Sequence, residues 1–80
     1  MNAMLPIPSR PRLSGFGQAL FSLAMMQRRL AHQAKRDAIE AERAGRLDRY
    51  LESRKECNRL WHDAKWHLAH VRQEYDRRRA

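Results

Sequence analysis

Ala44-Gly45-Arg46 is the stretch of this 80-residue chain that decides its fold. Gly45 is the only glycine after Gly17, and the sequence on both sides of it is rich in Ala, Leu, Arg, Glu and Gln, which are good helix formers. Glycine readily adopts the left-handed conformation that ends many helices. The first question is therefore whether a helix stops at Gly45 or continues through it.

The apolar residues answer this question. At about 100° per residue, those before Gly45 gather on one side of a helix, and so do those after it. On a single straight helix the two stripes would be rotated from each other by roughly 130° and would share no face. A turn at 44–46 removes this conflict, so we predict helices over about 15–43 and 47–78. The residues expected in the core are Leu23, Leu30, Ala34, Ala38, Leu47, Tyr50, Cys57, Trp61, Leu68, Val71 and Tyr75.

The predicted fold class is all-α, with residues 14–80 forming an antiparallel two-helix hairpin. The stripe of the first helix is mostly alanine in its second half, so the two helices alone bury little area per residue. Two hairpins that pack into a four-helix bundle would cover this thin core, and we therefore expect a homodimer. The alternative is one long bent helix whose halves pack on different partners.

Residues 1–13 are predicted to form an extended, proline-rich arm. Pro6, Pro8 and Pro11 exclude an early helix and favour a polyproline-like conformation. Pro8 and Pro11 form a PxxP pattern, which makes a peptide-groove ligand an alternative to a simple arm. Residues 1–36 contain no Asp or Glu, a composition also found in organellar presequences, but the prolines oppose that interpretation.

The net charge of +8 comes almost wholly from the two ends of the chain. Residues 30–76 hold all nine acidic residues and ten of the basic ones, so the body is nearly neutral. In a hairpin folded about residue 45, positions whose numbers sum to about 90 lie opposite each other, which would place Arg12 beside Arg78. Clustered guanidinium groups suit phosphate or carboxylate ligands. The expected contacts to a polyanion or an acidic partner are Arg10, Arg12, Arg28, Arg29, Arg77, Arg78 and Arg79.

Two groups of apolar residues are expected to remain exposed after the hairpin forms. The start of the first helix is apolar nearly all the way round, and such a helix must be covered from more than one direction. Trp66 falls opposite the stripe of the second helix, and an outward tryptophan commonly anchors an interface. The residues predicted to bind a partner are Phe16, Leu20, Phe21, Met25, Trp66 and His70.

The sequence gives no support for a metal, a cofactor or catalysis. Cys57, His62, His67 and His70 are zinc-ligand types, but Cys57 lies on the core side, whereas His67 and His70 are expected to point away from the core. A site that bridges a dimer through His67 and His70 is the remaining alternative. Cys57 is expected to be a small buried residue, and a lone thiol fits a reducing, cytoplasmic location. The apolar run Phe16 to Met26 is too short to span a membrane.

These observations lead us to expect a small non-catalytic regulatory or adaptor protein that docks on a protein partner and thereby controls, for example inhibits, that partner. One alternative is a nucleic-acid-binding protein that uses the arginines at its ends. Acidic residues occur along both predicted helices, which opposes reading of a DNA groove. Further alternatives are a structural subunit of a larger assembly and a helix that lies on a membrane surface.

Overall fold

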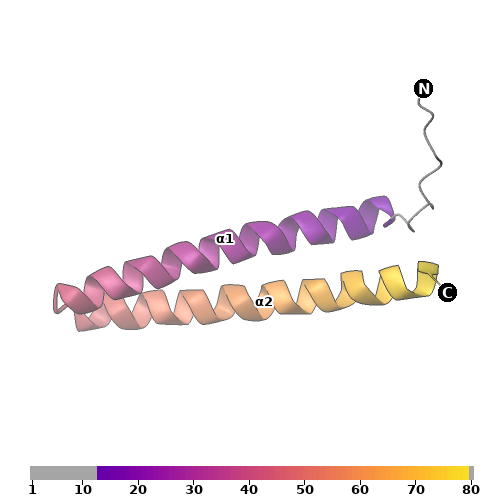
Figure 1. Cartoon of the computed structure of the whole chain (residues 1–80). Helices are drawn as coiled ribbons and strands as arrows, with labels where there is room; N and C mark the ends of the chain where they lie inside the picture. Colours follow the sequence, from indigo (N-terminus) through magenta and orange to yellow (C-terminus); the bar gives the residue numbers. More distant parts are fainter. Residues whose placement is uncertain (1–12, 80) are drawn as a thin grey trace, which may run out of the picture.

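The computed structural model describes residues 13–79, which form two α-helices and contain no strand. α1 spans Gly15–Arg43 and α2 spans Leu47–Arg79. The helices run antiparallel and side by side, so the start of α1 and the end of α2 lie at the same end of the pair (Figure 1). The predicted all-α hairpin is confirmed. The expected arm lies outside the described residues except for Leu13, and so do Arg10 and Arg12.

A glycine-dependent cap ends α1. Gly45 adopts a φ of +71°, in the left-handed region. The Arg46 backbone N–H donates to the Ala41 carbonyl at 2.8 Å, and the Gly45 N–H donates to the Glu42 carbonyl at 3.1 Å. This pair of hydrogen bonds is the Schellman motif, which satisfies carbonyl groups that have no partner within the helix. α2 can then start at Leu47, with Asp48 favourably placed beside its positive N-terminal end.

The contact between the helices follows a seven-residue repeat. Along α1, the buried or half-buried positions recur at alternating steps of three and four residues, and the same spacing recurs along α2. This spacing is that of the a and d positions of a coiled coil, and it keeps one narrow seam facing the partner helix. The seam of α1 consists of Gly17, Leu20, Ala24, Gln27, Ala31, Ala34, Ala38 and Ala41; that of α2 consists of Tyr50, Ser53, Cys57, Leu60, Ala64, His67, Val71 and Glu74.

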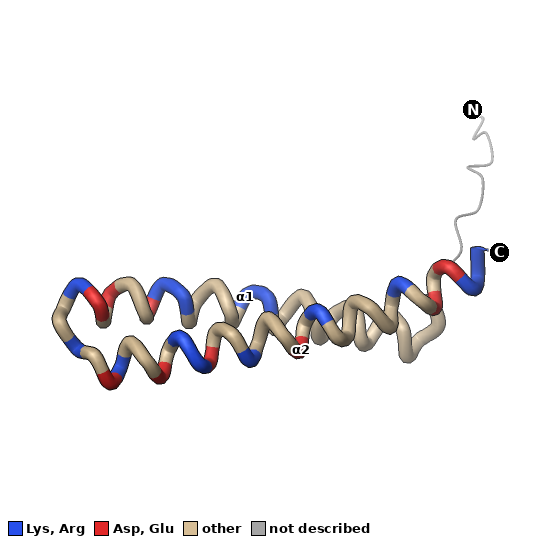
Figure 2. The backbone as a smooth tube through the Cα atoms, turned by 90° about the horizontal axis from the view of Figure 1, so that it is seen from below, with Lys and Arg blue, Asp and Glu red and all other residues tan. Residues whose placement is uncertain are grey.

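The seam is built mainly from small residues. Ala24, Ala31 and Ala64 are completely buried, and Ala31 and Ala34 pack with Cys57 and Leu60 in a central cluster. Small side chains let two helices approach closely but remove little apolar area from water. A pair of helices in this register is expected to wind with a left-handed twist, and the two tubes cross in Figure 2.

The seven-residue repeat corrects part of the expected core. Leu30 and Leu47 are 49% and 68% exposed, respectively, because neither occupies a seam position. Leu60, which was not expected in the core, is buried at the centre. Ala34, Ala38, Cys57 and Val71 are buried. The other expected core residues are only half-buried: Tyr50 within the seam, and Leu23, Trp61, Leu68 and Tyr75 beside it.

Candidate docking surface

The open end of the hairpin is held by contacts between Ser14, Gly17 and Glu74. The Ser14 hydroxyl accepts a hydrogen bond from the Gly17 N–H at 3.0 Å and caps α1. The Ser14 N–H donates to Glu74 Oε1 of α2 at 3.3 Å, and Arg78 Nε lies 3.6 Å from the same oxygen. Hydrogen bonding from Ser14, aided by the charges of Arg78 and Arg77, lowers the pKa of Glu74. These contacts fix the start of α1 against α2.

Because only two helices pack together, the seam leaves a long lateral face on each side. We call the side that carries Phe16, Leu23, Leu30 and Trp66 the apolar face. At the open end it contains a groove of about 270 Å³, lined by Phe16, Gly17, Leu20, Trp66, His70, Glu74 and Arg77. Phe16 is 75% exposed and Trp66 is 56% exposed. The Trp66 ring packs against His70 with 4.1 Å between ring centroids. Four of the predicted partner-binding residues therefore share this groove.

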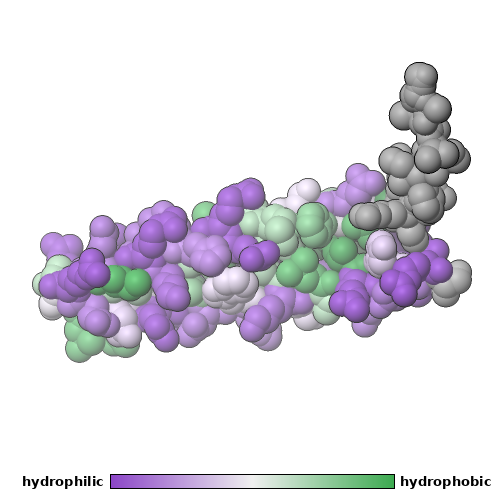
Figure 3. All heavy atoms as spheres, in the orientation of Figure 1, coloured by the Kyte–Doolittle hydropathy of each residue, from purple (hydrophilic) through white to green (hydrophobic). Residues whose placement is uncertain are grey.

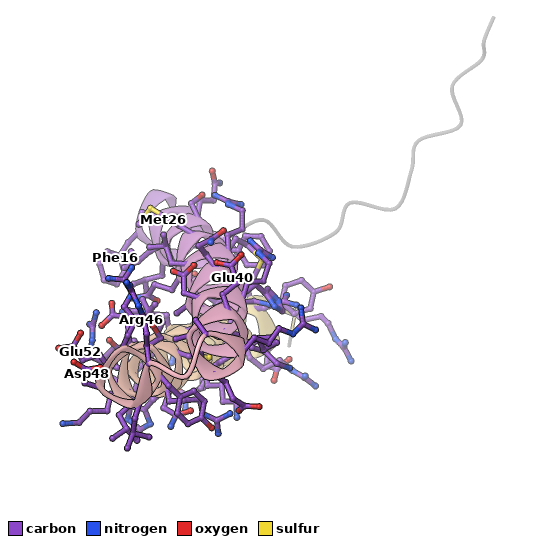
Figure 4. The ribbon with its side chains drawn as sticks, turned by 90° about the vertical axis from the view of Figure 1, so that its left-hand side faces the viewer. Phe16, Met26, Glu40, Arg46, Asp48 and Glu52 are labelled. Carbon is purple, nitrogen blue, oxygen red and sulfur yellow. The ribbon has the colours of Figure 1, made fainter. Side chains whose placement is uncertain are left out.

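The apolar face continues from the groove towards the middle of α1. Leu23 and Leu30 follow Phe16 at seven-residue steps, so the three lie on one side of the helix. Met26 is exposed and extends to the same side as Phe16 in the end-on view (Figure 4). On the side of the molecule seen in Figure 3, hydrophobic residues also gather mainly towards the open end. The half of the hairpin near the open end is thus the more apolar one.

Phe21 lies on the opposite side of the hairpin from Phe16. It lines a second groove, of about 410 Å³, together with Leu13, Leu68, Val71, Arg72 and Tyr75. Met25 is half-buried, and its sulfur lies 3.9 Å from an Arg28 nitrogen. The structure therefore divides the six predicted partner-binding residues between two faces. This division follows from helical geometry, because residues five apart on a helix point to different sides.

We call this opposite side the basic face. The Arg28 guanidinium of α1 lies over the Trp61 ring of α2, 5.7 Å from its centroid, and the His32 ring packs edge-on against the same indole. Arg54 lies 6.0 Å from the centroid of the Tyr50 ring. The positions that share this side by helical periodicity carry the cations Arg28, Lys35, Arg54, Lys65, Arg72 and Arg79.

Several acidic residues lie on the apolar face rather than on the basic face. Arg59 forms ion pairs with Glu56 at 2.6 Å and Asp63 at 3.6 Å on the apolar face. Glu52 extends to the same side as Phe16 (Figure 4), and Asp37 and Glu40 line a groove with Arg49 near the turn. The expectation that these acidic residues oppose reading of a DNA groove stays a prediction. It depends on which face each acidic side chain reaches, and this is set by the register of the seam.

The described arginines of the predicted polyanion cluster do not gather in one place. Arg77 lines the apolar groove, and Arg78 contacts Glu74 at the open end. Arg28 lies over Trp61, far along the pair, and Arg29 is exposed next to it. Arg79 ends α2 at the open end. The expected convergence of arm and tail involves Arg10 and Arg12, outside the described residues.

The histidines are placed differently from expectation. His67 occupies the seam, and its Nδ1 lies 2.9 Å from Gln27 Oε1 of α1, whereas His70 lies on the apolar face. His67 therefore does not point away from the core, and the two rings do not form the outward pair that a bridging metal site would need. Cys57 is a free, buried thiol. Within residues 13–79, no three potential metal ligands of the His, Cys, Asp and Glu types converge.

Neither helix, over the residues that the structure describes, is long and apolar enough to cross a membrane. Comparison of the chain with protein-family models, with curated proteins and with solved structures finds no match.

Proposed function

We propose that this protein is a small, non-catalytic adaptor that works by helix–helix docking through its apolar face, and that a second copy of the chain is the occupant of that face. The observation that carries the proposal is the exposure of Phe16 of α1 and Trp66 of α2, which line the same groove. Large exposed aromatic residues in a cluster are typical of interfaces. The proposed dimer is the four-helix bundle expected from the sequence.

The thin seam is the first argument for a dimer. No large side chain of the described residues is fully buried, and the central cluster contains two alanines, one cysteine and a single leucine, Leu60. A chain of this size gains little stability from such a core alone. Aromatic side chains bury about 150–250 Å² each when they are covered. At about 25 cal/mol per Å², covering Phe16 and Trp66 would contribute several kcal/mol before the cost of association.

Charge is the second argument. The apolar face carries charges of both signs, among them Glu56, Arg59 and Asp63, so two copies related by a two-fold axis can meet without strong repulsion. The basic face would bring only like charges together, which is unfavourable. A dimer through the apolar face leaves both basic faces outward. That arrangement gives the protein two equivalent surfaces for a client, which is the property of an adaptor.

A different protein with a helix of the same apolar pattern is the alternative occupant, and it corresponds to the regulator or inhibitor expected from the sequence. The further alternative, a structural subunit of a larger assembly, would use the same surface but would stay permanently bound to its partner. The lone buried thiol of Cys57 supports a cytoplasmic location as part of the proposal.

Sedimentation equilibrium on the purified chain tests the proposal. We expect the mass of a dimer at micromolar concentration, and a monomer for Trp66→Ser at the same concentration with unchanged helix content by circular dichroism. Leu51→Ser is the matched control, because Leu51 is similarly exposed but lies near the turn. A monomeric unsubstituted protein, or a Trp66→Ser dimer of full strength, would overturn the choice of a second copy as occupant.

A further inference from the structure

The basic face has a feature that the proposed docking does not use. From Gln18 to Ile39 in α1, and from Leu51 to Arg79 in α2, no position that faces this side holds Asp or Glu. Glu42, next to the turn, is the only acidic residue at an equivalent position. The cations therefore follow most of the length of the pair. Along α2, the row extends roughly 27 Å from Arg54 to Arg72, at a rise of about 1.5 Å per residue.

Most of these cations are not neutralised by the protein. Arg28 and Arg54 contact aromatic rings or a thioether, and neither forms an ion pair with a carboxylate of residues 13–79. Lys35 and Lys65 are exposed and also lack such an ion pair among the described residues. Arg72 pairs with Asp76 at 3.5 Å, but both side chains are mostly exposed and the interaction is screened by water.

Aromatic rings lie between the cations. Trp61 is held under Arg28, in the middle of the face, and Phe21 and Tyr75 line the groove that also contains Arg72. Phe21 is exposed and Tyr75 is half-buried. Surfaces that combine a track of positive charge with ring faces bind single-stranded nucleic acid, because the cations neutralise phosphates while the bases stack on the rings.

We propose that the basic face is a binding site for single-stranded nucleic acid. The site runs along both helices, with Arg28, Lys35, Arg54, Lys65 and Arg72 contacting phosphates and with Phe21 and Tyr75 offering surfaces for bases. It differs from the apolar face in position and ligand, and it does not depend on dimer formation. An acidic protein would use the cations but not the alternation with rings, and a duplex keeps its bases stacked inside.

Fluorescence anisotropy of a labelled oligothymidylate of about 15 nucleotides tests the proposal. The key variant is Lys35→Glu with Lys65→Glu, since neither side chain makes a contact that the fold needs. We expect affinity to fall about tenfold or more at moderate salt, and the slope of log affinity against log salt to become shallower by about 1.4 for two lost contacts. The matched control is Arg49→Glu with Arg77→Glu, which makes the same change in net charge on the apolar face.

The control pair should retain most of the affinity. Equal loss in both double variants would show that net charge alone attracts the oligonucleotide, and would overturn the site. Tighter binding of a duplex of the same length, or equal binding of polyglutamate, would overturn the assignment of single-stranded nucleic acid as the ligand. Helix content measured for each variant ensures that a loss of binding is not a loss of fold.

Discussion

Glu74 of α2 closes over Gly17 of α1, and the carboxylate occupies the space that a side chain at residue 17 would need. A Cβ at Gly17 would overlap Glu74 Oε2, whereas a Cβ at Gly15 would meet no atom within 4 Å. The absence of a side chain at Gly17 is thus what lets Glu74 reach Ser14. The open end of the hairpin, where the apolar groove lies, depends on this contact.

Gly17→Ala should therefore weaken the open end, although alanine is the better helix former. Glu74 must turn away and lose its contact with Ser14. Gly15→Ala is the control, because it changes the same residue type in the same helical turn without a clash. We expect Gly17→Ala to be less stable than Gly15→Ala by about 1 kcal/mol or more in urea denaturation. Equal stability of the two variants would contradict the described contact.

The contact between Ser14 and Glu74 also predicts that the stability of the folded protein depends on pH. Glutamate in an unfolded chain has a pKa of about 4.3. Hydrogen bonding from Ser14 lowers the pKa of Glu74 in the folded protein. Its contribution is therefore complete above the unfolded pKa and is lost as the pH falls through the lower, folded pKa. We expect the melting temperature to fall more steeply below about pH 4.3 in the unsubstituted protein than in Glu74→Gln. If the melting temperatures of the two proteins fall equally with pH, Glu74 does not have this role.

The close approach of the two helices at the centre of the seam can be tested by replacing a buried alanine with a larger residue. Ala31 is completely buried against the other helix, so Ala31→Leu should force the helices apart and cost about 1–3 kcal/mol. Ala69→Leu, on the exposed outer side of α2, makes the same chemical change and should alter stability little. Chemical denaturation of the two variants measures the difference. A neutral Ala31→Leu would mean that residue 31 does not face α2.

The turn depends on the backbone of Gly45. Its left-handed φ of +71° costs residues with a Cβ roughly 1–2 kcal/mol, so Gly45→Ala should destabilise the hairpin by about that amount. Gly45→Asn should cost less, since asparagine tolerates this conformation better. Thermal unfolding of both variants checks the order. A Gly45→Ala variant as stable as the original would contradict this dependence of the turn on Gly45.

The hairpin could be predicted from sequence because one glycine separates two apolar stripes that cannot share a face. The details of the core could not, since the prediction used a period of 3.6 residues and the seam follows 3.5. That difference accounts for Leu30, which belongs to the predicted stripe but lies outside the seam, and for Leu60, which the prediction omitted. A search for spacings of three and four residues would have found Gly17, Gln27, His67 and Glu74 as seam positions.

The candidate sites were only partly predictable for a simpler reason. Phe16, Leu20, Trp66 and His70 meet in one groove, but Phe21 lies on the opposite face, because residues five apart on a helix point to different sides. The row of cations on the basic face depends on the register of the seam, and it becomes visible only when both helices are placed in contact.

The central claim is that the two faces of one hairpin serve different partners, and the two tryptophans report on them separately. Trp66 lies on the apolar face and Trp61 under Arg28 on the basic face. The decisive measurement is tryptophan emission of Trp61→Phe and Trp66→Phe during dilution and during titration with oligothymidylate. We predict that Trp66 responds to dilution only and that Trp61 responds to the oligonucleotide only. A response of Trp66 to the oligonucleotide, or no response of Trp61, would contradict the account.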